Sequence, residues 1–492
     1  MTTTARRLVQ LGRESIVYGF SGVVQSIIGV ALIPLYTRVF SPSDFGVIAL
    51  VNSLAALLFP LVVLGLDNSS ARWFYDTDDP GRKKTIISSW FWAQAAAGCL
   101  IAALVLLFAP HVTALMFGSR EHLLLVCLAV GAVPLATPVK VLGNLLRYQR
   151  RPWTSSTFSV ATVLVTVGIT IWLVLIRRSG IAGFYLASLI AAGVTAVAAL
   201  YLLRNWVSIT SFSWKLLKEM VRFGLPLVPA AVAYWLATSS DRFVLTLFWS
   251  ESEVGLYSLG TYVASALGLV VGAFQRAFGP FAFSIHREQG SGQVYAKTLT
   301  VYAWGGCFLC TSLTLFAPML LRVFTTGQYL PAASCVPFLA FSYVLLGARD
   351  IASIGAAISK RSIPVATSIL IAAATGVGLN FLLDPRMGRD GAGIASMSAC
   401  LVSIIYLFWV SQRLHKIPYR FGPAVACFVL SWTLIAVDRF CPIPNELTGF
   451  AVRVAMCAAF IPAAFVFRVA RPSDVRRIMV RWTSGKGHQR SR

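Results

Sequence analysis

The chain has 492 residues, of which 57% are hydrophobic and only 12% are charged, and its mean hydropathy is +0.75. A soluble domain of this length does not need so much apolar surface, so the composition excludes an ordinary soluble enzyme. The formal net charge of +24 would suit a nucleic-acid partner. However, the basic residues lie beside apolar segments and not on one domain face, which argues against nucleic-acid binding.

Apolar segments follow one another along the whole chain, each about 20 residues long, which is enough to cross about 30 Å of hydrocarbon as a helix. Fourteen are predicted, at 16–39, 45–66, 85–108, 123–146, 154–176, 181–203, 222–247, 255–278, 297–317, 331–357, 364–383, 391–411, 421–440 and 449–467. Because every backbone amide in lipid needs a partner within the protein, these segments must be helices. No small-x-small cleavage site follows the first segment, so it is predicted to remain as an anchor. The sequence therefore predicts an all-α polytopic membrane protein.

Lys and Arg residues are distributed unevenly between the two sides that an even number of spans defines. When residues at the ends of spans are counted with the adjacent loop, about 30 of the 42 fall on the N-terminus, the even-numbered loops and the C-terminus, whereas about eight fall on the odd-numbered loops. The others, Lys140, Arg242, Arg349 and Arg453, lie within spans. Because Lys and Arg in short loops stay on the cytoplasmic side, both termini are predicted to be cytoplasmic.

The two halves of the chain keep step at an offset of about 209 residues. Ser41–Val47 corresponds to Ser250–Leu256, between the first and second spans of each half, and Phe108–Pro110 corresponds to Phe316–Pro318, at the end of the third. Two further matches keep the same order, Arg150-Arg151 with Lys360-Arg361 and Ala182-Gly183 with Ala392-Gly393. This predicts two six-helix lobes at 1–210 and 211–418, two extra helices at 419–469, and a basic cytoplasmic tail at 470–492.

The repeat also predicts how the lobes are related. Six is an even number, so both lobes enter the membrane with the same orientation and form a parallel repeat about an axis along the membrane normal. This arrangement is typical of transporters that alternate access between two lobes. A solute path is therefore expected between the lobes, near the midplane of the membrane.

The loops carry no motif of a membrane-bound enzyme. The sequence contains no Walker A motif, no G-x-S-x-G and no H-E-x-x-H, and no outer loop is long enough to fold as a domain. The histidines show no metal-ligand spacing, and the pair Cys307 and Cys310 lies within an apolar span, where small packing residues are the simpler interpretation. We therefore expect no catalytic residue, no metal and no cofactor.

Charged residues within spans indicate where a path could run, because a charge near the bilayer centre costs at least about 2.5 kcal/mol unless it faces protein or water. Asp241-Arg242 lies in the seventh span, Arg349-Asp350 in the tenth and Lys140 in the fourth. Two interpretations stay open for each doublet. It is either a neutral clamp between helices, or its arginine lines a path for an anionic solute, for which the planar guanidinium is suited because it bonds two phosphate oxygens at once.

Two stretches resemble a known family. Gly65-Leu66-Asp67 followed by Ala71–Asp76 is similar to the end of the second helix in bacterial polysaccharide transporters. Ser240–Phe243 leading to Glu253–Ser258 is similar to their seventh-helix pattern. On these residues the chain resembles the O-antigen and exopolysaccharide repeat-unit flippases of the multidrug/oligosaccharidyl-lipid/polysaccharide exporter superfamily, over essentially its whole length.

The resemblance implies a flippase, not an enzyme, that moves an undecaprenyl-diphosphate-linked oligosaccharide to the outer leaflet of the bacterial cytoplasmic membrane for surface polysaccharide synthesis. It implies a cavity between the lobes with cationic residues for the diphosphate, H+ or Na+ as coupling ion, and membrane lipid and the polysaccharide polymerase machinery as candidate partners. The expected cargo-binding residues are Arg72, Arg242, Lys140, Arg349 and Arg276, of which Arg72 and Arg242 match the family's patterns. Those expected to neutralise charge or couple an ion are Asp67, Asp241 and Asp350.

Other classes of function stay open. A drug exporter of the same superfamily typically has twelve helices, and the basic residues within the spans outnumber the acidic ones, which favours an anionic cargo. The lipid II flippases share fourteen helices, but the Asp-Arg pair and the later Gly-x-Tyr favour the polysaccharide type. A membrane polymerase or ligase acting on the same glycan would need the large outer loop that this sequence lacks.

Overall fold

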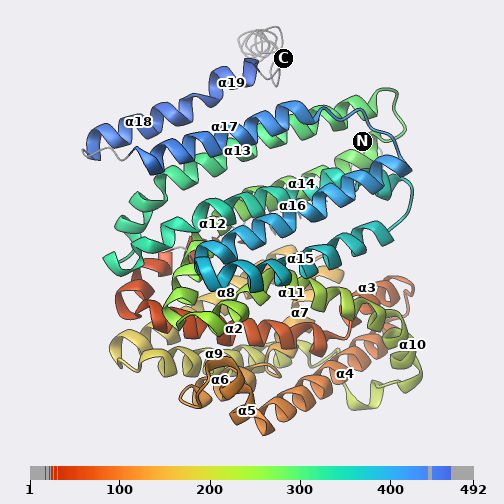
Figure 1. The fold of residues 1–492 in the computed structure, drawn as a ribbon. Coiled ribbons are helices and arrows are strands. Elements are labelled where there is room, and N and C mark those ends of the chain that lie inside the picture. The colour runs from red at the N-terminus through yellow and green to blue at the C-terminus, as the bar shows by residue number, and fades with distance from the viewer. Residues whose placement is uncertain are drawn as a thin grey trace, which may run out of the picture. The chain divides into compact units, whose positions relative to one another are not determined.

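The computed structural model describes residues 17, 21–22, 24–25, 27–29, 31–441 and 446–466 of the chain. Within these residues every regular element is a helix (Figure 1). Thirteen of the described helices are long and apolar enough to cross a membrane. The all-α polytopic class predicted from the sequence is therefore confirmed. The predicted first span lies partly outside the described residues, and a short apolar helix at Ile27–Val39 corresponds to its second half. The predicted basic tail lies wholly outside the described residues.

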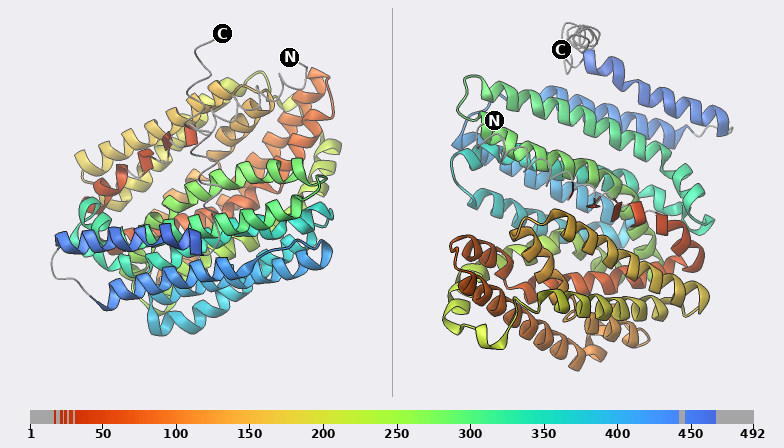
Figure 2. Two further views of the ribbon diagram at one scale, coloured as in Figure 1. Left: turned by 90° about the horizontal axis from the view of Figure 1, so that it is seen from above. Right: turned by 180° about the vertical axis from the view of Figure 1, so that it is seen from behind.

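The chain divides into two compact units. The first comprises Met1–Leu256 and Phe324–Gln328, and the second comprises Tyr257–Val323 and Tyr329–Arg492. In Figure 2 the first unit is followed along the chain from red to yellow-green. The predicted lobe boundary at residue 210 thus precedes the end of the first unit, and the division into two six-helix lobes stays a prediction.

The spans of the first unit are built mostly from broken helices. They are α2 (Pro42–Val63) with α3 (Leu66–Tyr75), α4 (Pro80–Leu107) followed by the short α5 (Ala109–Phe117), α6 (Leu123–Ala132) with α7 (Ala136–Tyr148), α8 (Pro152–Ile171) with the π-helix η1 (Trp172–Ile176), α9 (Gly180–Leu203), and α10 (Trp214–Gly224) with η3 (Leu225–Leu227) and α11 (Val228–Phe248). A 3-10 turn, η2 (Ile209–Ser211), precedes α10.

The second unit begins at Tyr257, within α12 (Glu251–Ile285). Its other helices are α13 (Ser291–Phe324), η4 (Gly327–Ser334), α14 (Val336–Ile358), α15 (Ile363–Met387), α16 (Arg389–Leu414), α17 (Phe421–Phe440), α18 (Glu446–Ala458) and α19 (Phe460–Val466). α16 packs against both α14 and α15. The glycine Gly388, at φ 55° and ψ −133°, makes the sharp turn between α15 and α16.

Several helices extend beyond the apolar segments predicted for them, because polar residues cap their ends. α2 begins at Pro42, three residues before the predicted span, since Ser41 and Asp44 form a capping box in which each side chain accepts a hydrogen bond from the other's backbone N–H. Pro42 at the first helical position has no amide to leave unsatisfied. Helix caps of this kind lie at the ends of spans, where apolar composition no longer marks the helix.

The break between α2 and α3 depends on glycine. Leu64 and Gly65 are both left-handed, at φ 52° and 66°. A Cβ atom on Gly65 would overlap the carbonyl group of Gly224 at the end of α10, and a Cβ on Gly224 would lie 2.7 Å from the carbonyl oxygen of Leu64. The Ser69 hydroxyl donates to the carbonyl oxygen of Met220 at 2.8 Å. α3 and α10 therefore meet backbone to backbone.

Residues in or next to the connections predicted to be cytoplasmic contact one another. The Ser88 hydroxyl donates to the carbonyl oxygen of Trp206 at 2.9 Å, and the Ser89 hydroxyl accepts from the N–H of Ser213 at 2.9 Å. The Tyr75 hydroxyl donates to the carbonyl oxygen of Tyr148 at 3.2 Å. Ser88 and Ser89 lie near the start of α4, next to the second connection. The sidedness of the loops stays a prediction.

We expect Gly65→Ala to lower the thermal midpoint of the purified protein and its free energy of unfolding by more than about 2 kcal/mol. The left-handed conformation of Gly65 and the overlap with Gly224 both oppose a side chain there. Gly168→Ala is the matched control, since a Cβ there meets nothing within 4 Å. Thermal unfolding in detergent would measure both. Equal midpoints for the two variants would contradict the close backbone contact between Gly65 and Gly224.

Candidate functional site

Two of the residues predicted from the sequence, Asp67 and Lys140, lie together inside the first unit. The Nζ atom of Lys140 lies 2.8 Å from Oδ2 of Asp67, and the two side chains are 22% and 23% exposed. Asp67 stands in the first turn of α3, directly after the glycine break, and Lys140 stands in α7, after the interruption of the fourth span between α6 and α7. The broken helices thus place the two charges side by side.

Three further side chains contact the members of this ion pair. The Gln94 amide, only 1% exposed, donates to Oδ1 of Asp67 at 2.9 Å and to the carbonyl oxygen of Val63 at 3.2 Å. The Tyr148 hydroxyl donates to the backbone oxygen of Asp67 at 3.1 Å. The Lys140 ammonium also lies 3.5 Å from the centre of the Phe59 ring, a cation–π contact. Both carboxylate oxygens of Asp67 therefore have a partner, which offsets the cost of holding the charges away from water.

A cavity of about 220 Å³ lies beside the ion pair. Its polar lining comes from Lys140 and from Asn52, Gln94, Thr137, Tyr185 and Ser188, and apolar residues of α2, α6 and α7 complete the wall. The Tyr185 hydroxyl donates to the carbonyl oxygen of Ile48 at 3.1 Å, which fixes one side of the wall. A space of this size holds several water molecules at about 30 Å³ each. The cavity therefore offers a small polar environment next to a positioned cation.

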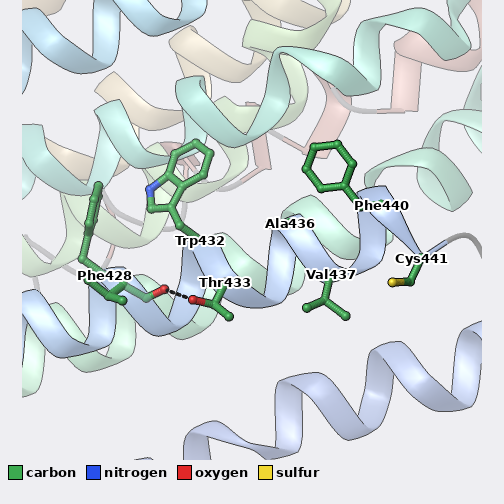
Figure 3. Close-up of a pocket in the computed structure, with 8 residues that line it drawn as sticks. Phe428, Trp432, Thr433, Ala436, Val437, Phe440 and Cys441 are labelled. Carbon is green, nitrogen blue, oxygen red and sulfur yellow. Dashed lines mark hydrogen bonds between the residues drawn. The ribbon is translucent and has the colours of Figure 1, made fainter.

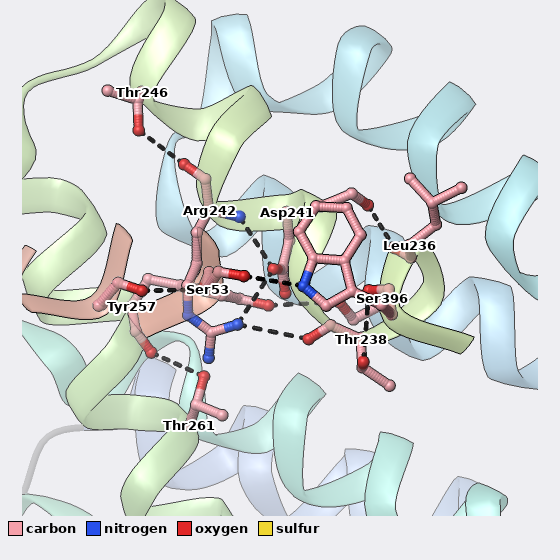
Figure 4. A network of polar contacts seen from close by, with 12 residues as sticks. Ser53, Leu236, Thr238, Asp241, Arg242, Thr246, Tyr257, Thr261 and Ser396 are labelled. Atoms are coloured by element: carbon pink, nitrogen blue, oxygen red, sulfur yellow. Dashed lines mark hydrogen bonds and ion pairs between the residues drawn. The ribbon is translucent and has the colours of Figure 1, made fainter. Parts of the chain in front are cut away.

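Arg242 and Asp241 are adjacent on α11, and their side chains contact each other (Figure 4). Its Nη1 atom is 3.4 Å from Oδ1 of Asp241 and donates to the carbonyl oxygen of Thr238 at 3.3 Å. Asp241 also accepts a hydrogen bond from the N–H of Arg242 at 2.8 Å. The two residues therefore form an ion pair, in which the side chain of Arg242 is 14% exposed and that of Asp241 is 10% exposed. Thr238, one helical turn before Arg242, is exposed.

Arg72 is exposed on α3 and packs its guanidinium against aromatic rings. The carbon Cζ lies 5.2 Å from the ring centre of Phe223 and 5.8 Å from that of Trp73. A guanidinium stacked in this way keeps its N–H groups directed outward, in the plane of the fork. The geometry leaves Arg72 suited to an anionic group at the end of the second span.

The remaining predicted residues belong to the second unit. Arg349 and Asp350 are neighbours on α14, both partly buried, and Asp350 lies close to Gln275 of α12 as well. Arg276 is exposed on α12. Each of the three predicted aspartates thus has a basic residue beside it, Lys140, Arg242 or Arg349.

Sequence reasoning missed several polar residues of the interior. Gln94 and Tyr148 hold Asp67 in the first unit, and Asn380 and Asp384 on α15 are 2% and 0% exposed in the second. The available signal was an amide or carboxylate within an apolar segment. Such a signal does not say whether the group faces a partner, lipid or a cavity, so it could only have given candidates.

Two hollows of the second unit have mainly apolar linings. One of about 580 Å³ lies along α17, where Phe428, Trp432 and Phe440 contribute large rings (Figure 3). Its Thr433 hydroxyl donates to the carbonyl oxygen of Val429 at 2.9 Å and is thereby satisfied. Another, of about 450 Å³, lies between α13, α14, α16 and α17 and is lined by apolar and aromatic side chains apart from the Tyr302 hydroxyl and the Cys307 thiol. Neither offers a cation for a diphosphate.

Residues 35–334, more than half of the chain, match the sequence model of the polysaccharide biosynthesis protein family. The chain belongs to this family. The succinoglycan biosynthesis transport protein ExoT of Rhizobium meliloti (strain 1021) is 23% identical over 283 residues, which cover 55% of this chain and only about half, 54%, of ExoT. The uncharacterized membrane protein MJ1068 of Methanocaldococcus jannaschii is 21% identical over 409 residues, covering 77% of this chain and 80% of MJ1068.

Solved structures share the fold. The lipid II flippase MurJ in an inward closed conformation superposes with a TM-score of 0.74 at 13% identity, covering 92% of this chain and 98% of MurJ. An inward-facing multidrug resistance MATE family transporter of the MOP superfamily gives 0.67 at 15% identity, covering 82% and 96%. MOP is the multidrug/oligosaccharidyl-lipid/polysaccharide exporter superfamily. The family predicted from the sequence is thus confirmed, and the fold of this polysaccharide biosynthesis family member is the one shared by the solved MurJ and MATE structures.

We expect Asp67→Asn and Lys140→Met each to destabilise the purified protein, and the double variant to lose less stability than the sum of the two losses. The reason is that either change alone leaves a charge without its partner in a largely enclosed site. A double-mutant cycle on thermal or denaturant unfolding should give a coupling of about 1–3 kcal/mol. Additive effects would show that the pair contributes nothing to stability.

Proposed function

We propose that the protein is a flippase for an undecaprenyl-diphosphate-linked oligosaccharide, moving the repeat unit from the cytoplasmic to the outer leaflet of the cytoplasmic membrane. The observation that carries the proposal is the positioned Lys140, held by Asp67 beside a polar cavity within the spans, in a member of the polysaccharide biosynthesis protein family. A diphosphate is the part of such a cargo that a buried cation recognises. ExoT, a relative named for succinoglycan transport, supports a polysaccharide precursor as the cargo class.

The charge pairs provide a route for binding and release. Lys140 is paired with Asp67 in this structure, and Arg242 is paired with Asp241. Diphosphate oxygens compete with these carboxylates for the same basic groups, because the donors that hold Asp67 and Asp241 are those that a phosphate accepts from. Binding of the cargo therefore exchanges one anionic partner for another, and its departure lets the ion pair form again.

The same pairs indicate how an ion gradient would be coupled. Lys140 already occupies a cation position 2.8 Å from Asp67, so a sodium ion would have to displace the ammonium. A proton needs no such displacement of the ammonium. H+ is therefore the favoured coupling ion at this pair, and Arg72, Arg276 and Arg349 are proposed to contact other parts of the anionic cargo.

The test follows lipid-linked repeat units on each face of the membrane. In cells without this gene, and in cells that carry Arg242→Ala or Lys140→Met, we expect repeat units to accumulate on the cytoplasmic face and surface polysaccharide to fall about tenfold or more, the factor that a loss of about 1.4 kcal/mol gives. Lys215→Ala is the matched control, because Lys215 is an exposed cation at the start of α10.

Each outcome decides between functions. Accumulation on the cytoplasmic face with the control unaffected supports the flippase and its cationic residues. Repeat units that reach the outer face and stay unpolymerised would contradict it and favour a polymerase or ligase. Wild-type surface polysaccharide in cells lacking the gene would exclude a role in this polysaccharide altogether.

A further inference from the structure

Two glycines that the internal repeat relates to each other lie backbone to backbone within the first unit. Gly46 is on α2 near its start and Gly255 is on α12 near its start, which matches the repeat offset of about 209 residues. A Cβ atom on Gly46 would overlap the carbonyl oxygen of Glu251, and a Cβ on Gly255 would overlap the carbonyl oxygen of Pro42. The two helices touch so closely that neither position can carry a side chain without moving a backbone.

Polar side chains hold the same place together. The Ser43 hydroxyl donates to Oε2 of Glu251 at 3.1 Å. Nε2 of His122, from the connection between α5 and α6, lies 3.2 Å from Oε1 of the same carboxylate. The imidazole also packs edge-on against the Phe117 ring, with centroids 4.8 Å apart. Glu251 thereby joins α2, α12 and the connection that follows α5.

A fourth segment joins this end of the first unit. Phe324–Gln328 belongs to the first unit although the chain on either side of it belongs to the second. The Thr37 hydroxyl donates to the carbonyl oxygen of Phe324 at 3.3 Å, and the Thr326 hydroxyl donates to the carbonyl oxygen of Thr37 at 3.4 Å. These side chain to backbone contacts tie the segment to the residues that precede α2.

All of these contacts fall at one predicted face of the membrane. The segments involved are the odd-numbered connections of the helix count, which the distribution of Lys and Arg places outside. Backbone contact between α2 and α12 leaves no passage at that point, because no side chain, still less a sugar, fits between them. A cargo leaving through this end needs the two helices to separate.

We propose that Gly46 and Gly255, together with Glu251 and its partners Ser43 and His122, form an outer latch that is closed in this structure and must open to release cargo. The glycines set how closely the helices approach, and the carboxylate holds them. The polar side chains of His122 and Glu251 remain 18% and 27% exposed, so water competes for their contact and the latch can open. The link to cargo release rests on the proposed function, whereas the closure itself does not.

The first experiment measures closure without any cargo. Val47 is 1% exposed beside Gly46, and a Val47→Cys reporter should react with a membrane-impermeant thiol reagent only when the latch opens. Adding Gly255→Ala should raise its rate of labelling about tenfold from the outer side, because the new methyl group forces α2 and α12 apart. Gly193→Ala is the matched control, since a Cβ at that helical glycine meets nothing within 4 Å. The chain without the reporter gives the background of its nine native cysteines.

Two further variants keep the test decisive if Gly255→Ala does not fold. Glu251→Gln adds no atoms to the contact and should raise labelling of the reporter about threefold, because it removes the charge that His122 and Ser43 hold. A disulfide between Ser43→Cys and Glu251→Cys should suppress labelling and stop transport, and reduction should restore both.

The outcomes separate the latch from the proposed function. Labelling that is unchanged in Gly255→Ala and Glu251→Gln, or transport that continues through the oxidised cysteine pair, would overturn the latch. Labelling that rises as expected in a protein that moves no lipid-linked oligosaccharide would support the latch and contradict the proposed cargo.

Discussion

A charge held within hydrocarbon needs a partner close by, and this requirement organises the interior of the first unit. Lys140 is tolerated in the fourth span because Asp67 lies 2.8 Å away and because Gln94 takes the other carboxylate oxygen. The helix breaks at Gly65 and between α6 and α7 bring these groups to one place. The same requirement explains why Asp241 and Asp350 each stand beside an arginine.

Backbone contact at glycine is the second organising feature. α2 is held near its first turn by Gly46 against α12, and directly after its last turn by Gly65 against the end of α10. Between these points the Trp235 indole of α11 donates to the carbonyl oxygen of Ser53 at 2.9 Å. The seventh span therefore follows α2 along its length, which accounts for its place in the first unit. Small residues allow such close approach where lipid supplies no hydrophobic drive between helices.

The two features differ in how easily they change. An ion pair can exchange one anion for another with little movement, which is what the role proposed for Asp67 and Lys140 in binding and releasing an anionic cargo requires. A glycine contact depends on the two helices touching, because neither Gly46 nor Gly255 has a side chain that could fill a gap between them. A transporter needs both kinds of contact, one to recognise its cargo and one to close a face of the membrane.

The sequence by itself determined the fold class, most of the spans and the family. Apolar length and the placement of Lys and Arg act locally along the chain, so they are readable without knowing what packs against what. The tertiary structure alone decided that Lys140 is paired with Asp67, that Gln94 supports the pair, and that Gly46 lies against the start of α12. These facts depend on which helices become neighbours and on where they break. Such packing is set by the fit of many small contacts distant in sequence, and no single segment carries that information.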